Sequence, residues 1–402
     1  MTATLTTVNG ILKEVYEGDI NDQLESEKIL MKRIEQSSAG VFENAGGKYV
    51  VFPLRTGRNH GISYRDENIQ LADAGRQKYA QAQEMLKYGY GRVYLTGQLI
   101  ELARTNQQSF ANAADREMTG LKDDLSRDEN RISWGHYQAT TVGFTGVISR
   151  CTAAVTGTTL TAPTYGILEP GMKVDFVDNT GTPVTGGTGR TITAALPYST
   201  SVTVDSSVTS VIGTNIVRSG NFGKEPYGIL QLIDNLGTVH NINSATAGNE
   251  YWRSTVDAST TTLSEAAMIA NCDGVRRLSG SRITAIFASL GVRRAYFNLM
   301  TSLRRYNEPK EWTGGLVGLA FNYEKEVPVV TDTMCPPNTM IGINEAEIKK
   351  YRTKPWYFAD DDGTVLKYVH NFDAWEALMK QYWQLVTHQR NAHWKMTTVT
   401  EA

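Results

Sequence analysis

The sequence has few of the features that mark a secreted, membrane or nucleic-acid-binding protein. Cysteine occurs only three times in 402 residues, at Cys151, Cys272 and Cys335, which favours a reducing compartment over a disulfide framework. The formal net charge of −2 lacks the basic surplus of a dedicated nucleic-acid binder. No window of about 18 apolar residues exists, so no membrane span is expected. The first residues, MTATLTTVNGILKEVYEGDIND, lack the basic start and apolar core of a secretory signal.

Motifs for catalysis or metal binding are also missing. The stretch GGTGRT at 186–191 is not followed by Gly-Lys-Ser/Thr, so it predicts a β-turn rather than a nucleotide loop. His388 and His393 are five apart, which suits neither helical metal ligation nor a zinc finger. Asp360–Asp362 lack the later glutamate of a calcium loop, and no Gly-x-Ser-x-Gly elbow is present. We therefore predict no enzyme, no cofactor and no metal.

A long polar stretch, residues 46–97, is the first unusual feature that the sequence does contain. Strand-like pieces lie at its two ends, Lys48–Leu54 and Lys87–Leu95, but Arg, Asn, Gln, Asp and Gly dominate the middle. A two-stranded hairpin of this composition has too little apolar surface for a core of its own and is marginal alone in water. A disordered surface loop is the alternative, against which the strand-like ends and nearby aromatic residues weigh.

A long amphipathic helix is predicted from about Gln98 to Trp134. This segment contains no proline, and its apolar residues recur mostly at steps of three and four, or sums of them, as one stripe: Leu99, Leu102, Phe110, Ala114, Met118, Leu121, Leu125 and Ile132. At 1.5 Å per residue, some 35 residues form a rod of roughly 50 Å. The first forty residues, by contrast, predict only a short helix around Leu24, Ile29, Leu30 and Ile34, and an arm lying on another surface.

Composition changes abruptly between Cys151 and Gly220, where Thr, Val, Gly and Ser dominate. Short β-branched runs such as MKVDFVD, RTITAAL and TSVTVDS predict a small all-β unit inserted into the chain. From Thr262 an α/β pattern returns, with a capping-box spacing between Thr262 and Glu265 before a helix. A buried strand ITAIFASL, a second helix, two strands joined by a Pro-Pro-Asn turn and two final strands around RNAH follow.

The order of these parts resembles the major capsid proteins of tailed bacteriophages, which have the Hong Kong 97-type fold shared with encapsulins. The stretches that carry the resemblance are GGKYVVFPLRTGRNHGISYRDEN through GYGRVYLTG, the predicted helix TGQLIELARTNQQSFANAADREMTGLKDDLSRDENRISWG, the segment EPYGILQLIDNLGTVHNINSATAGNEYWRSTVDAS, and YWQLVTHQRNAHWKMTTVT. The segment LEPGMKVDFVDNTGTPV is similar to a small β-barrel that some of these coat proteins carry after their spine helix.

The resemblance implies an α+β subunit with an N-terminal arm, an extended loop, a spine helix, peripheral and axial domains, and an inserted all-β domain. The corresponding ranges are 1–41 for the arm, 42–97 for the loop, 98–137 for the spine helix, 138–150 for a peripheral strand, 151–220 for the insertion, 221–253 for the peripheral domain and connection, 254–369 for the axial domain and 370–402 for the closing peripheral strands.

The resemblance also implies a structural role. Copies would form hexamers and pentamers of an icosahedral head that encloses double-stranded DNA without reading it, assisted by scaffolding, portal and decoration proteins. The protein would be made in the host bacterial cytoplasm and end in the virion, without a membrane partner. Candidate contacts between subunits are the loop arginines Arg55, Arg58, Arg65 and Arg76, and a covalent cross-link would join Lys78 or Lys87 to Asn391.

Three other interpretations remain open at this point. An encapsulin shell shares the fold but holds cargo enzymes. An enzyme with its site in the α/β unit at 262–343 belongs to a different class and predicts a compact particle with a ligand pocket. A phage tail or adhesion protein would account for the Thr-rich β unit, although tail tubes rarely need so long a helix.

Overall fold

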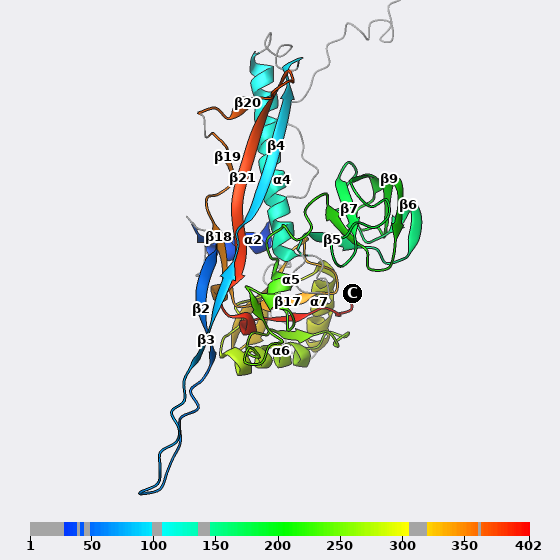
Figure 1. Cartoon of the computed structure of the whole chain (residues 1–402). Coiled ribbons are helices and arrows are strands. Elements are labelled where there is room, and N and C mark those ends of the chain that lie inside the picture. Colours follow the sequence, from blue (N-terminus) through cyan, green and yellow to red (C-terminus); the bar gives the residue numbers. More distant parts are fainter. Residues whose placement is uncertain are drawn as a thin grey trace, which may run out of the picture.

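The computed structural model describes residues 28–37, 41–43, 49–98, 107–135, 145–304, 320–360 and 363–402. The molecule is elongated (Figure 1). A narrow hairpin projects from one end, a long strand pair backed by a helix forms the other, and two compact β-containing units lie between them.

The long strand pair, here called the ribbon, consists of β4 (Lys87–Thr96) and β21 (Ala374–Thr387), which run antiparallel. Along β4, Gly91, Val93 and Leu95 are buried while the residues between them are exposed, as strand alternation requires when one face is covered. The helix α4 (Gln107–Trp134) lies along that covered face (Figure 1). On its other edge, β21 pairs in succession with β20 (Leu366–Tyr368), β19 (Tyr357–Phe358) and β18 (Ile348–Arg352).

The predicted long helix is confirmed as α4, whose 28 residues span about 42 Å. Its expected beginning, near Gln98, falls next to residues 99–106, which lie outside the described part of the chain. The helix ends where expected, at Trp134, whose fully buried ring lies 5.9 Å from that of Phe287 at 79°. Gly135 follows in a left-handed conformation (φ 65°), and a Cβ on Gly228 would collide with its backbone.

The arm contributes one short helix, α2 (Ile29–Gln36), which packs on α4 and β18. Leu30, Met31 and Ile34 are its buried side chains, so the predicted amphipathic helix is confirmed for Ile29–Ile34. Leu24 lies outside the described residues. After the helix, β1 (Val41–Phe42) adds a parallel strand to β18.

The inserted domain is a six-stranded antiparallel sheet in the order β5-β10-β7-β8-β9-β6. Its strands are β5 (Val147–Arg150), β6 (Val155–Thr161), β7 (Lys173–Val177), β8 (Arg190–Ala195), β9 (Ser201–Ser210) and β10 (Asn215–Arg218). The three β-branched runs identified in the sequence are β7, β8 and β9, and the all-β prediction is confirmed. A strand was expected in the peripheral domain at 138–150. This expectation is corrected, because the strand there, β5, pairs with β10 and belongs to the inserted domain.

A third six-stranded sheet, besides the inserted sheet and the one built on β21, is the helix-packed sheet, with the order β13-β22-β17-β14-β16-β15. Its strands are β13 (Thr255–Asp257), β14 (Ala285–Ala288), β15 (Ala320–Tyr323), β16 (Lys325–Thr331), β17 (Met340–Ile343) and β22 (Trp394–Met396). On one face, Ile286 and Ala288 pack in a core with α6 (Glu265–Ser279) and α7 (Leu290–Arg304). On the other face, Ala285 and Phe287 belong to the core that also includes Trp134. The cap of α6 is Ser264, whose hydroxyl accepts from Ala267 N, and not the predicted Thr262.

Two expected domain limits change because strands cross between the sheets. The range 254–369 was expected to be one domain, yet β18, β19 and β20 pair with β21 of the ribbon. The range 370–402 was expected to be peripheral, yet β22 pairs with β13 and β17 in the helix-packed sheet. Between β10 and β13, the chain forms the short helix α5 (Ile229–Leu232) and the strands β11 (Thr238–Val239) and β12 (Ile242–Asn243). A strand pattern in the sequence carries no information on which sheet receives the strand.

Candidate subunit-contact surface

The projecting hairpin is formed by β2 (Val50–Gly57) and β3 (Lys78–Glu84), paired from Val50–Glu84 to Gly57–Lys78. Phe52, Leu54 and Ala80 face the body and pack against its core. The strand predicted at Lys48–Leu54 is confirmed for Val50–Leu54, with β3 as its partner, and Lys48 lies outside the described residues. The other predicted piece, Lys87–Leu95, is β4 of the ribbon, so the extended part of the range 42–97 ends before Lys87.

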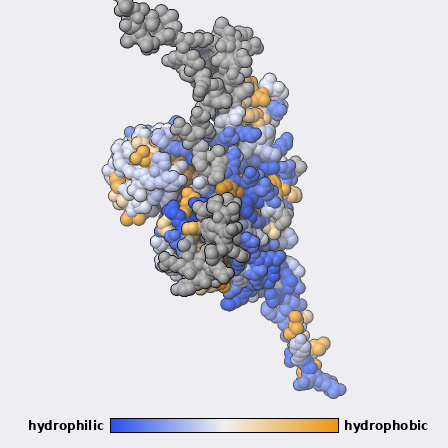
Figure 2. Space-filling model, turned by 180° about the vertical axis from the view of Figure 1, so that it is seen from behind, coloured by the Kyte–Doolittle hydropathy of each residue, from blue (hydrophilic) through white to orange (hydrophobic). Residues whose placement is uncertain are grey.

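Beyond these strands, residues 58–77 extend away from the body as two narrow limbs (Figure 1). Four apolar side chains on the limbs are exposed: Ile62 by 80%, Tyr64 by 100%, Ile69 by 52% and Leu71 by 80%. Figure 2 shows such apolar side chains gathered along the hairpin between hydrophilic stretches. Exposed apolar side chains gathered in this way mark a contact site, because soluble monomers rarely leave large apolar areas open to water.

The four predicted loop arginines, Arg55, Arg58, Arg65 and Arg76, all lie exposed on this hairpin. Arg65 Nε donates to Ser63 Oγ at 3.3 Å. Within the part of the chain that the structure describes, none of the four forms an ion pair with a carboxylate. Their guanidinium groups are therefore available to acidic groups outside the subunit.

The three residues predicted to form a cross-link are placed very differently from one another. Lys78 is exposed on β3, at the start of the projecting limbs. Lys87 Nζ donates to Gly223 O of its own chain at 3.0 Å. Asn391 is only 8% exposed, and its Nδ2 donates to Leu278 O at 3.5 Å. Because the Asn391 amide faces the interior of its own subunit, the structure gives the predicted cross-link no support from that side.

The uncovered face of the ribbon is the second candidate contact surface. Tyr88, Tyr90 and Tyr94 of β4 are about half exposed, at 59%, 57% and 46%. Tyr88 packs edge-on against Tyr382 of β21, with ring centroids 4.9 Å apart. A hydrogen bond with Tyr382, together with partial burial, raises the pKa of Tyr90. Large, rigid rings on an open sheet face are the kind of side chain that is enriched at protein interfaces.

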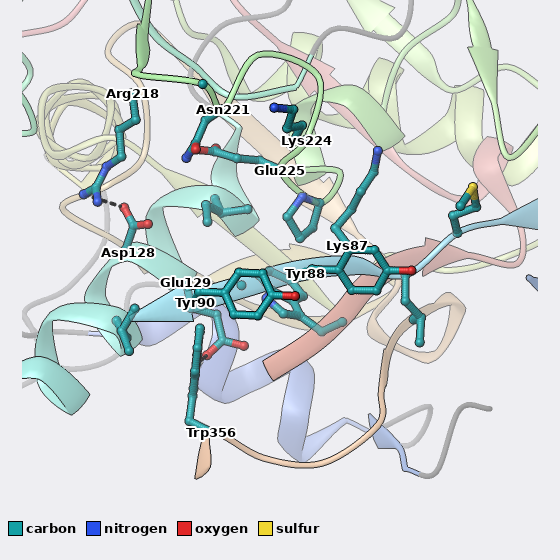
Figure 3. A pocket seen from close by; sticks show the side chains of 18 residues that line it. Lys87, Tyr88, Tyr90, Asp128, Glu129, Arg218, Asn221, Lys224, Glu225 and Trp356 are labelled. Carbon is teal, nitrogen blue, oxygen red and sulfur yellow. Dashed lines mark hydrogen bonds and ion pairs between the residues drawn. The ribbon is translucent and has the colours of Figure 1, made fainter. Parts of the chain in front are cut away.

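A pocket of about 610 Å³ lies where the ribbon, α4 and residues 218–226, at the end of the inserted domain, meet (Figure 3). Tyr88, Tyr90 and Trp356 are among its lining residues. Its carboxylates already have protein partners: Trp356 Nε1 donates to Glu129 Oε2 at 3.1 Å, and Arg218 Nη2 lies 3.0 Å from Asp128 Oδ1. The pocket therefore lies at a packing interface between parts of the subunit, where the carboxylates are already bound by other side chains of the chain.

A buried ionic cluster on α4 stabilises this packing interface. Arg131, whose side chain is 4% exposed, contacts Asp128 at 2.7 Å and Glu225 at 2.9 Å. Burial alone would lower the pKa of Arg131, but the two carboxylates raise it and keep the guanidinium charged. One turn earlier, Arg127 Nη1 lies 2.7 Å from Glu169 Oε1 of the insertion. The inserted domain is thus held to α4 through Glu169 and, by way of the contact between Arg218 and Asp128, through its last strand.

The motifs that the sequence analysis rejected lie at the following places in the structure. Residues 186–191 form a turn entering β8 within the inserted sheet, as predicted, with Gly186 at φ 74°. His393 is fully buried, and its ring nitrogens are occupied by Asn344 N and Thr387 Oγ1. Among the described residues, no group of His, Cys, Asp and Glu side chains could hold a metal ion. The calcium-like run includes Asp361 and Asp362, which lie outside the described residues.

Comparison with known proteins yields structural matches only. No protein-family model matches the sequence, and no curated protein does. A chain of the cyanophage A-1(L) capsid asymmetric unit is similar over 99% of this chain and 100% of its own, with a TM-score of 0.62 and 13% identity. This chain has the fold of a phage capsid protein. The capsids of native and empty GTA particles also match over 100% of both chains, with TM-scores of 0.52 and 0.51 and 8% identity each.

Full coverage in both directions means that the similarity includes the hairpin, α4 and both compact units rather than one shared module. None of the helices in the described residues has the length and apolarity that crossing a bilayer demands.

Proposed function

We propose that this chain is the major capsid protein of a tailed phage and has the Hong Kong 97-type arrangement of arm, extended loop, spine helix, peripheral domain and axial domain. The observation that carries the proposal is the projecting hairpin with its exposed apolar side chains and exposed arginines, in a chain with the fold of a capsid subunit. In these terms α4 is the spine helix, the ribbon belongs to the peripheral domain, and the helix-packed sheet belongs to the axial domain.

The contact between copies is of the head-to-tail kind. A hairpin that extends away from its own body can lie across the next subunit, which presents a different surface to it. Heterologous contacts of this kind close into rings when the rotation closes. Rings of six and five copies then tile an icosahedral shell. The open face of the ribbon, with Tyr88, Tyr90 and Tyr94, offers aromatic area to a neighbouring copy.

Many modest contacts are enough for such a shell. A typical specific interface buries about 1,600 Å² in total, and affinity is only the surplus over the cost of ordering both partners. A subunit that touches several neighbours must break all of these contacts in order to leave, so the effective affinity rises without any one strong contact. A net charge of −2 also keeps electrostatic repulsion between copies low.

Double-stranded DNA inside the shell is enclosed and not read, since the near-neutral chain has no basic surplus for sequence-independent binding. Scaffolding, portal and decoration proteins are the further partners, none of them in a membrane. The protein is made in the host bacterial cytoplasm and ends in the virion. A role as an enzyme is not part of the proposal. Near the expected enzyme site at 262–343, the carboxylate of Glu401 is already engaged by Ser289 Oγ and Asn338 N.

Electron microscopy of the purified full chain tests the proposal. Uniform closed shells are expected, alone or with a scaffolding protein, and co-purified DNA identifies the viral form. Shells loaded with enzymes instead of DNA would indicate an encapsulin. Small compact particles under all assembly conditions would contradict both shell functions and return the α/β enzyme as the better hypothesis.

A further inference from the structure

A single histidine joins the root of the hairpin to the body of the subunit. His240 is fully buried in the turn between β11 and β12, where it adopts a left-handed backbone conformation with φ 52°. Its ring Nδ1 lies 3.3 Å from Glu84 Oε2, at the end of β3. Its backbone oxygen accepts from Gln83 N at 3.1 Å. Both contacts hold β3 where the hairpin leaves the body.

The other ring nitrogen fixes the protonation state of His240. Nε2 accepts a hydrogen bond from Thr387 N, the last residue of β21, at 3.1 Å. A nitrogen that accepts from a backbone N–H carries no proton of its own, so the ring is neutral and Nδ1–H donates to Glu84. His240 therefore bridges β3 of the hairpin and β21 of the ribbon only while it is neutral.

The groups packed around the ring come from several elements. Phe52 of β2, Tyr227 and Trp252 surround it with aromatic rings at centroid distances of 5.8, 5.8 and 6.3 Å. Glu84 is the carboxylate that faces it, and Arg390 and His388 are the cationic or titratable groups close enough to act on it or be acted on by it. The Arg390 guanidinium is engaged by backbone carbonyls, including Leu232 O and Leu236 O.

We propose that His240 is a proton-sensitive latch at the root of the hairpin. When the ring takes up a proton at Nε2, it can no longer accept from Thr387 N, and two N–H groups then face each other in a buried site. The bridge between β3 and β21 opens, and the hairpin is freed to change its direction relative to the ribbon. The proposal concerns the conformation of the subunit and does not depend on shell assembly.

The direction of the pKa shift agrees with this geometry. Burial lowers the pKa of His240 below its usual value of 6.5, and the opposing effect of Glu84 does not restore it. A buried histidine with a lowered pKa gives a closed state that binds fewer protons than the open state, so the closed state loses stability as pH falls below about 6.5. The latch is therefore closed at neutral pH and opens on acidification.

Hydrogen exchange of the isolated full chain, read by mass spectrometry, tests the latch. The amides of Thr387 and Gln83 both donate to His240, so their exchange reports opening directly. With correction for intrinsic rates, the open population at these amides is expected to rise up to about thirtyfold between about pH 7.5 and about pH 5. Peptides from β14 in the helix-packed sheet should show no comparable rise.

Three variants separate the latch from a merely structural role. His240→Gln, which cannot titrate, should lose the pH dependence at Thr387 and Gln83, while His370→Gln, at an exposed turn, should keep it. Glu84→Gln removes the carboxylate that favours the charged ring, so the acid response should persist and extend to lower pH. Flat exchange in the wild-type chain, or an unchanged acid response in His240→Gln, overturns the proposal. If His240→Gln does not fold, the wild-type profile and the Glu84→Gln variant still decide it.

Discussion

Lys350 Nζ lies 2.8 Å from Glu35 Oε1, in a contact that joins β18 to the arm helix. The same ammonium group contacts Glu129 of α4 and lies 5.4 Å from the centre of the Trp383 ring. The Lys350 side chain is only 1% exposed. One buried cation thus ties together the arm, the long helix and the ribbon sheet.

Replacing Lys350 by methionine should destabilise the subunit by about 3–5 kcal/mol, because the substitution leaves the Glu129 carboxylate buried without its cation. Urea unfolding followed by circular dichroism measures this loss. Lys349→Met is the matched control, since Lys349 is half exposed on the same strand and should cost less than about 1 kcal/mol. Equal losses in the two variants would show that burial of the pair is not the cause.

Shortening the hairpin should abolish assembly without unfolding the subunit. Residues 58–77 are joined to the body only through β2 and β3, so a two-residue Asn-Gly turn between Gly57 and Lys78 removes the exposed limbs and keeps both strands. We expect a melting temperature close to that of the full chain and no shells by electron microscopy. Arg58→Gln and Arg76→Gln remove charge alone and should reduce shell assembly less than the shortened hairpin does. Normal shells from the shortened chain would disprove the role given to the limbs.

Alanine substitution should lower the stability of the subunit at Gly91 and raise it at Gly120, because the two glycines have different surroundings. A Cβ on Gly91 of β4 would lie 2.5 Å from Leu125 Cδ1, so Gly91→Ala forces the ribbon and α4 apart and should cost about 1–3 kcal/mol. Gly120, on the exposed side of α4, has open space around it, and Gly120→Ala should add about 0.5–1 kcal/mol through helix propensity. Urea midpoints of the two variants measure both signs. A stabilised Gly91→Ala variant would contradict the close approach.

Subunit stability should fall on mild acidification partly because of His393. Burial lowers the pKa of this ring to about 3, whereas the unfolded chain titrates near 6.5, so the unfolded state binds more protons between these values. Stability therefore rises with pH in this window, and about 2 kcal/mol should be lost between about pH 7 and about pH 5. His393→Gln should reduce the slope of unfolding free energy against pH, and His370→Gln should leave it unchanged. An identical slope in His393→Gln would contradict the burial of a neutral ring.

The local elements of the fold could be predicted from the sequence because each has a periodic pattern of its own. The apolar stripe predicts α4 to its last residue, Trp134, and the β-branched runs predict β7, β8 and β9. The partner of each strand could not be predicted in the same way. The sequences of β18 in the ribbon sheet and of β17 in the helix-packed sheet do not say which sheet receives each strand, so the expected limit at residue 369 was wrong.

The candidate contact surface was predictable only in outline. A polar stretch with arginines and strand-like ends indicates a projecting hairpin, and the arginines do lie exposed on it. His240, Lys350 and Arg131 were not identified, since a single histidine, lysine or arginine in a sequence gives no sign that folding will bury it. Their partners Glu84, Glu129 and Glu225 are far from them along the chain, so only the tertiary structure reveals these contacts. For the same reason, the sequence did not show that Asn391 would face the interior.

The chain crosses between the ribbon sheet, which is built on β21, and the helix-packed sheet, and this crossing has a consequence for synthesis. β21 is the strand on which the ribbon sheet is built, and β22 lies between β13 and β17 in the helix-packed sheet. Neither sheet can close before the ribosome has translated residues 374–396, although most of their other strands emerge much earlier. Nascent chains therefore wait with unpaired strand edges, a state that is prone to aggregation. Production of this protein in a heterologous cell should accordingly depend on chaperones that shield the incomplete polypeptide until its last strands are delivered.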